Sequence, residues 1–201
     1  MKKLNLLILT TILIITGCTN TVHYKPELLS EKLSTLSARF DGKALIFTEE
    51  KEDLKEYSQN PSSLTGSVTT LKTNVGIHLR EISKEVFSRL FEDGADHSNS
   101  LKSTDKYTII IKPEVLNYDY RYNQLKNLGF AITPETKIDL YVTFKDKEGN
   151  DLLSKKYSSD YLTGGTYLAS VQPHERVNKS IHESIFNLLV QVSNDILSLV
   201  N

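Results

Sequence analysis

Residues 106–123 read KYTIIIKPEVLNYDYRYN, and this stretch decides the fold. It is dense in β-branched and aromatic residues, which favour strands. Pro113 has no N–H to donate to a neighbouring strand, so we expect a bulge or a sheet edge there. Beyond the proline, the period of two places successive side chains on opposite faces. One face would carry Leu116, Tyr118, Tyr120 and Tyr122, and the other Val115, Asn117, Asp119 and Arg121.

Two more strands follow in the sequence. Residues 137–145 repeat the alternation, with Ile138, Leu140, Val142 and Phe144 on one face. Residues 146–150, DKEGN, have the composition of a hairpin turn, and a last strand is expected over 152–161. These strands should therefore add to the sheet as hairpins.

Two segments have the periodicity of amphipathic helices. Residues 71–91 carry apolar side chains at steps of three and four, and residues 177–199 do the same over a longer stretch. The candidate N-caps of the first helix are Ser67, Thr69 and Thr70. Gly76 inside it predicts close packing against the sheet. Pro173 suits the first turn of the second helix, whose wide apolar stripe favours packing on a sheet over a coiled-coil seam.

The segments before these helices supply one strand and a loop. Residues 43–48, KALIFT, form a short apolar run typical of a strand that is buried on both faces. Residues 49–66 are charged and then rich in Ser, Asn, Pro and Gly, which predicts a long surface loop that is either functional or disordered. Residues 92–105 also read as loop.

The order of these elements predicts the fold class. It is β-α-β-β-β-α, an α+β two-layer sandwich with two long helices on one face of a four-stranded mixed sheet. The first two strands should pair in parallel through a right-handed crossover. We expect one domain over residues 43–201, with the second face of the sheet uncovered or covered by another element.

The N-terminus has the layout of a secretory signal peptide over residues 1–17. Lys2 and Lys3 precede an uncharged apolar stretch of twelve residues, which is shorter than the roughly 20 residues of a membrane-spanning helix. Cys18 is the only cysteine in the chain and has no disulfide partner. Residues 15–18, ITGC, resemble a bacterial lipobox, in which the cysteine is lipidated through its sulfur and becomes the first mature residue.

The lipobox resemblance has further implications. Acyl chains such as palmitate on Cys18 would anchor the protein stably in the membrane. Thr19 after the cysteine implies an outer-membrane, periplasm-facing location in a cell that has an outer membrane. The alternative is an ordinary signal peptide with a chance cysteine. If Cys18 is lipidated, residues 18–42 comprise this cysteine and a polar tether with a nascent amphipathic helix. The alternative for this segment is that it forms an integral part of the core.

The charge balance argues against a nucleic-acid partner. The chain has 24 Lys and Arg against 25 Asp and Glu, and loss of Lys2 and Lys3 with the signal leaves a formal net charge of −3. Such a chain has no overall electrostatic attraction to phosphate backbones.

No legible motif indicates an enzyme, a metal site or a cofactor. The pairs His174-Glu175 and His182-Glu183 lack the second histidine that a zinc-protease helix needs four residues after the first. The sequence has no GxSxG, no phosphate-binding GxxxxGK[ST] and no GxGxxG. Acidic residues around 146–151 lack the ligand spacing of a calcium loop and read as a hairpin turn.

The tyrosine stripe is the one feature that suggests a binding surface. Tyrosine offers a large contact area with a polar tip, which suits a protein or lipid interface. The hypothesis is that this face and the 57–66 loop contact a partner. Its residues are Tyr118, Tyr120, Tyr122, Tyr57, Asn60 and Leu64. The alternative is that the tyrosines are core or half-exposed sheet residues.

A family resemblance covers roughly residues 43–200 as well as the lipobox. It rests on the strand at 43–48, the helix end VFSRLF at 86–91, the tyrosine-bearing strand, the KIDLYV hairpin with its Glu-Gly-Asn turn, and the closing helix. This pattern resembles the YajG-type bacterial lipoproteins and, more distantly, LptE-like and transporter-auxiliary envelope lipoproteins. The resemblance implies a non-enzymatic envelope role and carries over no functional residue.

Three function classes follow. The preferred one is an accessory or adaptor subunit of an envelope assembly or transport complex, anchored by lipid and with an envelope protein as partner. The second is a regulator of a periplasmic peptidoglycan enzyme, which a long disordered tether would favour. The third is a binding protein for a small hydrophobic ligand, which an apolar cavity between sheet and helices would favour.

Overall fold

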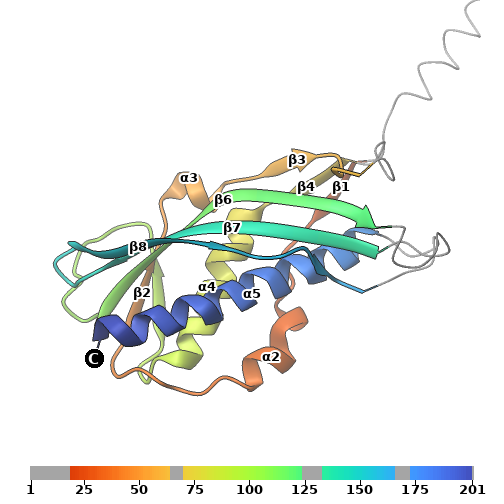
Figure 1. The fold of residues 1–201 in the computed structure, drawn as a ribbon. Helices are drawn as coiled ribbons and strands as arrows, with labels where there is room; N and C mark the ends of the chain where they lie inside the picture. The colour runs from red at the N-terminus through yellow and green to blue at the C-terminus, as the bar shows by residue number, and fades with distance from the viewer. Residues whose placement is uncertain (1–18, 64–69, 124–132, 166–172, 201) are drawn as a thin grey trace, which may run out of the picture.

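The computed structural model describes residues 19–63, 70–123, 133–165 and 173–200. The chain forms an α+β fold in two layers, as the sequence predicts (Figure 1). The strands are β1 (Thr19–Val22), β2 (Ala44–Phe47), β3 (Tyr57–Gln59), β4 (Thr70–Thr73), β5 (Ala95–Ser98), β6 (Ile109–Asn123), β7 (Thr133–Lys145), β8 (Asp151–Ser158) and β9 (Leu162–Thr163). The helices are η1 (Pro26–Leu29), α2 (Ser30–Ser34), α3 (Glu50–Asp53), α4 (Val75–Leu90) and α5 (Pro173–Val200).

The main sheet has the strand order β5-β2-β6-β7-β8, with β9 pairing to β7. β2 is parallel to both β5 and β6, whereas β6, β7 and β8 are antiparallel to their neighbours. The four strands expected from the sequence are therefore present, and β2 and β6 pair in parallel as predicted. The sheet has six strands rather than four, because β5 forms within the predicted loop 92–105 and β9 follows the end of the strand predicted over 152–161.

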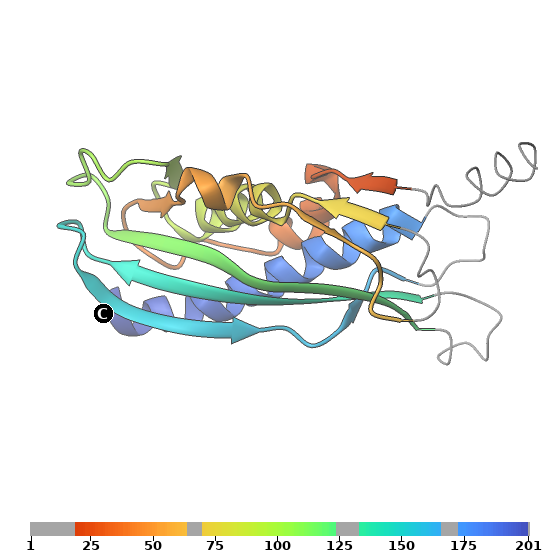
Figure 2. The same cartoon turned by 90° about the horizontal axis from the view of Figure 1, so that it is seen from above.

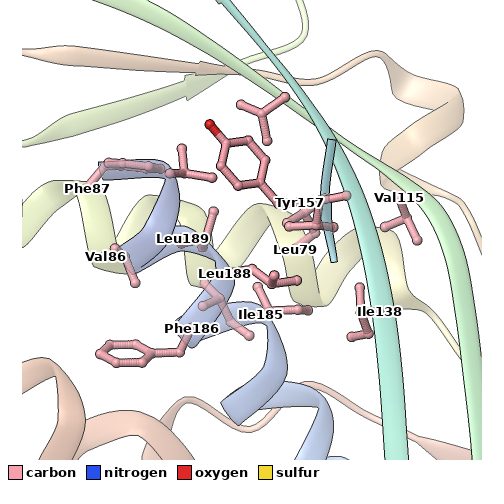
Figure 3. Close-up of a cluster of buried hydrophobic side chains, with 14 of the residues drawn as sticks. Leu79, Val86, Phe87, Val115, Ile138, Tyr157, Ile185, Phe186, Leu188 and Leu189 are labelled. Atoms are coloured by element: carbon pink, nitrogen blue, oxygen red, sulfur yellow. The ribbon is translucent and has the colours of Figure 1, made fainter. Parts of the chain in front are cut away.

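α4 and α5 lie together on one face of this sheet (Figures 1 and 2). Their apolar stripes meet the inward side chains of β6, β7 and β8 in one core (Figure 3). Fully buried members include Ile82 and Val86 of α4 and Ile185 and Leu188 of α5. Ile138 of β7 lies among them, so the alternation of the strands and the periodicity of the helices both direct their apolar side chains into this one core.

A second sheet of three strands, β1-β4-β3, lies beside the main one. Its strand β4 occupies residues that the sequence assigned to the start of the first helix. Leu71 fits the helical spacing, but its backbone pairs with β1 and β3, and its side chain is fully buried there. α4 begins only at Val75, and its N-cap is Asn74, whose side chain accepts a hydrogen bond from the Ile77 N–H at 2.8 Å.

The N-terminal segment corrects the expectation of a tether. Over residues 19–42 the structure has a paired strand, a 3₁₀ turn and a short helix. Four large side chains of this segment are buried in the common core: Val22, Leu29, Leu33 and Phe40. Tethers expose their side chains, whereas these residues hold the segment on the domain.

The pairing of β6 explains how Pro113 is accommodated within a strand. β2 ends at Phe47 and pairs with β6 only as far as Ile111, so Pro113 lies where β6 has become an edge strand on that side. This confirms the expected edge. A bulge follows between Val115 and Asn117, and it leaves Leu116 51% exposed. Leu116 therefore does not share a face with the tyrosines, contrary to strict alternation.

Two expected loops contain further structure. Residues 49–63 carry α3 and β3, so the described part of the predicted 49–66 loop is largely ordered on the domain. Residues 95–98 form β5. β2 is buried on both faces as predicted, because Leu45 packs with Tyr107 and Ile110 in a small second cluster.

Candidate functional site: the N-terminal joint and two polar clusters

The predicted tyrosine surface is part of the core. Tyr118, Tyr120 and Tyr122 are 2%, 0% and 6% exposed. Tyr57 of β3 packs against Tyr118 with ring centroids 5.5 Å apart, and the Tyr120 hydroxyl donates to the Gln59 carbonyl oxygen at 3.0 Å. Burial raises the pKa of Tyr118 and of Tyr120. These tyrosines are covered by β3 and β4, so the exposed aromatic contact face expected from the sequence is not formed by them.

The other predicted site residues do not assemble into one surface either. Tyr57 is half-buried, and Asn60 is exposed, with its side-chain oxygen accepting a hydrogen bond from Thr70 Oγ1 at 2.8 Å. Leu64 and Cys18 lie outside the described residues. The prediction of lipid on Cys18 therefore stays a prediction.

The structure instead draws attention to the joint between the N-terminal segment and the domain. β1 pairs with β4 in parallel, starting at the register pair Thr19 and Thr70. The chain then crosses the N-terminal half of α5. There the His23 carbonyl oxygen accepts a hydrogen bond from Asn178 Nδ2 at 2.7 Å, and the Lys25 N–H donates to His182 Nε2 at 3.4 Å.

Aromatic packing completes this joint. Tyr24 stacks on His182, with ring centroids 5.2 Å apart, and meets His78 edge-on at 5.9 Å. The His78 and His182 rings are themselves 5.1 Å apart. We call these four residues, Tyr24, His78, Asn178 and His182, the joint cluster. It ties one segment near the N-terminus to α4 and α5 at once.

Hydrogen bonds and burial fix the protonation of His182. Burial lowers the pKa of His182 to about 4, against the opposing hydrogen bond to the Asn178 carbonyl oxygen, and burial also lowers the pKa of His78. The neutral His182 ring donates from Nδ1 to that oxygen at 2.9 Å, which leaves Nε2 as the acceptor for the Lys25 N–H. Nδ1 thus binds the preceding turn of α5, and Nε2 binds the N-terminal segment.

Two cavities flank the joint. One, of about 270 Å³, is lined by Lys25, Glu27, Leu28, Glu175, Arg176 and Lys179. The other, of about 220 Å³, is lined by residues of β1, the turn after it and the start of α4, among them Thr21, Asn74 and His78. The lining of the first cavity is formed largely by charged side chains, whereas that of the second includes the apolar side chains of Val22, Tyr24 and Ile77. Both cavities lie beside the N-terminal segment.

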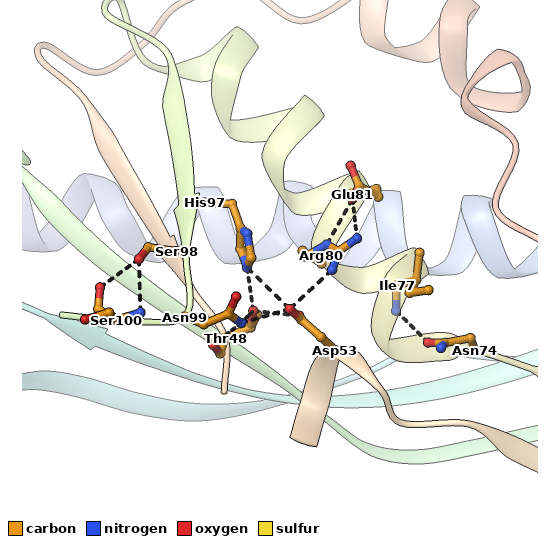
Figure 4. A network of polar contacts seen from close by, with 10 residues as sticks. All are labelled: Thr48, Asp53, Asn74, Ile77, Arg80, Glu81, His97, Ser98, Asn99 and Ser100. Atoms are coloured by element: carbon orange, nitrogen blue, oxygen red, sulfur yellow. Dashed lines mark hydrogen bonds and ion pairs between the residues drawn. The ribbon is translucent and has the colours of Figure 1, made fainter. Parts of the chain in front are cut away.

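A second polar cluster lies at the carboxyl ends of the parallel strands β2 and β5 (Figure 4). Thr48 Oγ1 donates to Asp53 Oδ1 at 2.7 Å and lies 2.6 Å from His97 Nε2. Asp53 Oδ2 also accepts from Asn99 at 2.9 Å and from Arg80 at 3.2 Å. Burial alone would raise the pKa of Asp53, but these hydrogen bonds outweigh it and lower the pKa.

This Thr-His-Asp arrangement does not have the geometry of an activated nucleophile. Because the Thr48 proton is donated to Asp53, the His97 ring must donate its own Nε2 proton to the Thr48 oxygen. A general base would need the opposite polarity, with the ring nitrogen accepting the hydroxyl proton. The cluster fastens α3 to β2, β5 and α4. It is invisible in the sequence because its members are spread over residues 48–99.

A third cluster lies on the outer face of the main sheet. The Arg121 guanidinium lies 3.7 Å over the Tyr161 ring and donates to Glu135 at 2.9 Å. The Tyr161 hydroxyl donates to Asp119, which also accepts from Ser62 at 3.1 Å. The alternation of β6 already placed Asp119 and Arg121 together on the face opposite the tyrosines. The period of two therefore predicts this charged face, whereas the candidate binding surface was assigned to the tyrosine face.

Within the described residues, no three His, Cys, Asp or Glu side chains are grouped to hold a metal ion. None of the helices in the same part of the chain is both long and apolar enough to cross a bilayer.

No family model matches the chain, and no curated protein matches it. Among solved structures, the chain is similar to a Xanthomonas campestris protein of the DUF330 family, with a TM-score of 0.46 and 9% identity over 89% of this chain and 91% of the other. A minor lipoprotein from Acinetobacter baumannii gives a TM-score of 0.37 and 11% identity over 77% and 91%. The PelC dodecamer from Paraburkholderia phytofirmans gives 0.37 and 11% over 76% and 92%. Likenesses this distant carry no argument about function.

Proposed function

We propose that this protein is a non-enzymatic bacterial lipoprotein, held at the membrane by lipid on Cys18. In this proposal it serves as an accessory or adaptor subunit of a cell-envelope assembly or transport complex, on the periplasmic side of the outer membrane. One observation carries the proposal. The only cysteine of the chain ends a signal-like segment with a lipobox-like sequence, immediately before the residue at which the packed domain begins.

The polar clusters support the non-enzymatic part of the proposal. In the cluster around Asp53, hydroxyl, carboxylate and imidazole are engaged with one another in a polarity unsuited to nucleophilic attack. In the joint cluster, both nitrogens of His182 are engaged with the backbone of other residues. The hydroxyl, carboxylate and imidazole groups of these two clusters are thus used in contacts that stabilise the fold.

The packing of residues 19–42 weakens one of the two alternative functions. A regulator of a peptidoglycan enzyme was favoured by a long tether, but residues 19–42 are packed on the domain and add no reach. A binding protein for a small hydrophobic ligand would need an apolar cavity under the sheet, and the two cavities described lie instead beside the N-terminal segment. The adaptor function needs neither feature.

In-cell photo-crosslinking tests the adaptor function. A photoreactive side chain at Tyr141, which is 36% exposed on the outer face of β7, should form adducts with proteins of one envelope assembly or transport complex, identified by mass spectrometry. The same group at Tyr118, which is 2% exposed, is the matched control and should form none. Adducts that are absent at both positions, or a turnover activity of the purified protein, would contradict the proposal.

A further inference from the structure

The position of the anchor relative to β1 determines how the domain meets the membrane. Successive Cα atoms are about 3.8 Å apart, so a lipid on Cys18 lies one residue from Thr19, the first residue of β1. β1 is not free to swing away, because it pairs with β4 along its whole length and buries Val22 at 2% exposure. Beyond β1, the joint cluster fixes residues 23–25 to α4 and α5.

The long elements of the fold end at the same pole as Thr19 (Figure 2). Thr70 is the register partner of Thr19, β6 ends where β7 begins at the pair Asn123 and Thr133, and β9 pairs with this same end of β7. We call this the near pole. The opposite, far pole carries the β7–β8 turn at residues 146–150 and the start of β6 (Figure 1).

The strand ends at the two poles differ in composition. The described strand ends at the near pole are uncharged residues that can form hydrogen bonds: Thr19, Thr70, Asn123, Thr133 and Thr163. The far turn and its flanks carry five charged residues, Lys145, Asp146, Lys147, Glu148 and Asp151, beside Gly149 and Asn150. Charged side chains also lie toward the near pole, among them Arg121, Glu135, Glu175 and Arg176. The orientation of the domain therefore follows from the position of the anchor and not from charge.

We propose that the domain stands with its near pole directly against the phospholipid headgroups, with no spacer, and its far pole pointing away from the membrane. This rests on the proposed lipidation of Cys18. At roughly 3.3 Å per residue, the 15 residues of β6 span about 50 Å, so the two poles lie about that far apart. A partner is then met along the sides or at the far pole of the domain.

The test uses the native lipidated protein in phosphatidylcholine vesicles that contain a headgroup spin-labelled lipid as a quencher. Cys18 is the only cysteine and its sulfur is occupied by lipid, so one added cysteine can carry a fluorophore. Asn60→Cys reports on the near pole, and Glu148→Cys on the far pole; both positions are exposed. We expect most of the fluorescence to be lost at position 60 and none at position 148.

A third variant inserts a Thr-led Gly-Ser linker of about 12 residues between Cys18 and Thr19. Such a linker has a root-mean-square length of roughly 20 Å, so it should restore most of the fluorescence at position 60. Equal quenching at the two positions in vesicle-bound protein, or quenching at position 60 that the linker does not change, would overturn the orientation alone. Protein that does not float with the vesicles would overturn the lipidation of Cys18, and the orientation with it.

Discussion

Single residues of β6 decide which of its side chains reach the core. The extra residue at the bulge turns Leu116 outward and brings Val115 and Tyr118 to the same inward face. Tyr120 and Tyr122 then follow the ordinary alternation into the core. Strict alternation places Tyr118, Tyr120 and Tyr122 on one face correctly, but it places Leu116 on the wrong face because it does not include the bulge. The alternation also gives no sign that a second sheet covers the tyrosines.

The burial of Tyr118 predicts a large effect on stability. Tyr118→Ala should lower the free energy of unfolding by about 3–5 kcal/mol, because it removes a ring packed against Tyr57 and Tyr120. Tyr141→Ala, on the exposed face of the next strand, should cost less than about 1 kcal/mol. Urea unfolding of the two variants measures both values. Equal, small losses would show that Tyr118 is a surface residue.

The joint cluster predicts a dependence of stability on pH. The pKa of His182 is about 4 in the folded protein and about 6.5 in the unfolded chain, so between these values the unfolded chain binds a proton that the folded protein does not. The stabilisation is therefore complete above pH 6.5 and is lost as the pH falls toward 4. The difference in pKa corresponds to about 3 kcal/mol.

Substitution of His182 separates its contribution to the pH-dependent loss of stability from the contribution of the Asp and Glu carboxyl groups, which also bind protons in this range. Between pH 6.5 and 4, the free energy of unfolding of His182→Gln should fall less steeply than that of the unmodified protein. Urea titrations at several pH values measure this difference. His174→Gln, at a partly exposed position earlier in the same helix, serves as the control. The same pH dependence in all three proteins would show that His182 is not held neutral at the joint.

At the scale of elements, the contact between α3 and α4 is unusually close. A Cβ added to Gly76 would lie 1.8 Å from the Glu52 carbonyl oxygen, and the Gly76 N–H donates to the Lys55 carbonyl oxygen at 3.2 Å. The sequence predicts close packing at this glycine, but against the sheet. The structure shows that the close neighbour is the backbone of α3.

This contact reverses the usual effect of alanine in a helix. Helix propensity alone would make Gly76→Ala stabilising by about 1 kcal/mol. The clash with backbone atoms cannot be relieved by a rotamer change, so we expect a net destabilisation of about 1–3 kcal/mol. Chemical denaturation checks this, with Lys84→Ala on the exposed side of the same helix as the control. A more stable Gly76→Ala variant would exclude the contact.

The N-terminal elements predict a contrast between adjacent leucines. Leu29 is 1% exposed in the core, whereas Leu28 is only partly buried at the rim of a cavity. Leu29→Ala should cost about 2–5 kcal/mol of unfolding free energy, and Leu28→Ala clearly less. Thermal and urea unfolding of the two variants distinguish the packed segment from a tether. If residues 19–42 were a tether, neither substitution would alter the transition.

Long periodic segments were the part of the fold that the sequence could predict. β6, β7, α4 and α5 carry enough repeats for their periods to be unambiguous, and β2 and β8 follow from composition and turn chemistry. Strands β1, β3, β4 and β5 are only three or four residues long, and their side chains show little alternation. Their pairing depends on distant segments, as in the parallel contact between Thr19 and Thr70. The joint cluster depends equally on contacts between residues 100 or more positions apart.

At the scale of the whole molecule, the proposed lipid on Cys18 would make the anchor and the domain one unit. The lipid-bearing residue would be followed at once by a paired strand, so force at the membrane would act directly on the domain core. Cys18→Ser should therefore move the protein from the membrane fraction to the soluble fraction without changing its unfolding transition. Fractionation of cells followed by immunoblotting checks the first result, and denaturation of the purified variant checks the second. A variant that remains with the membrane would require another means of attachment.

The central claim concerns the chemical state of one sulfur atom. Mass spectrometry of the N-terminal peptide of the protein purified from its native membrane tests it most directly. We expect a peptide that begins at Cys18 and carries the mass of acyl chains, with residues 1–17 removed. A peptide that begins at Met1, or one in which Cys18 is unmodified, would contradict the account.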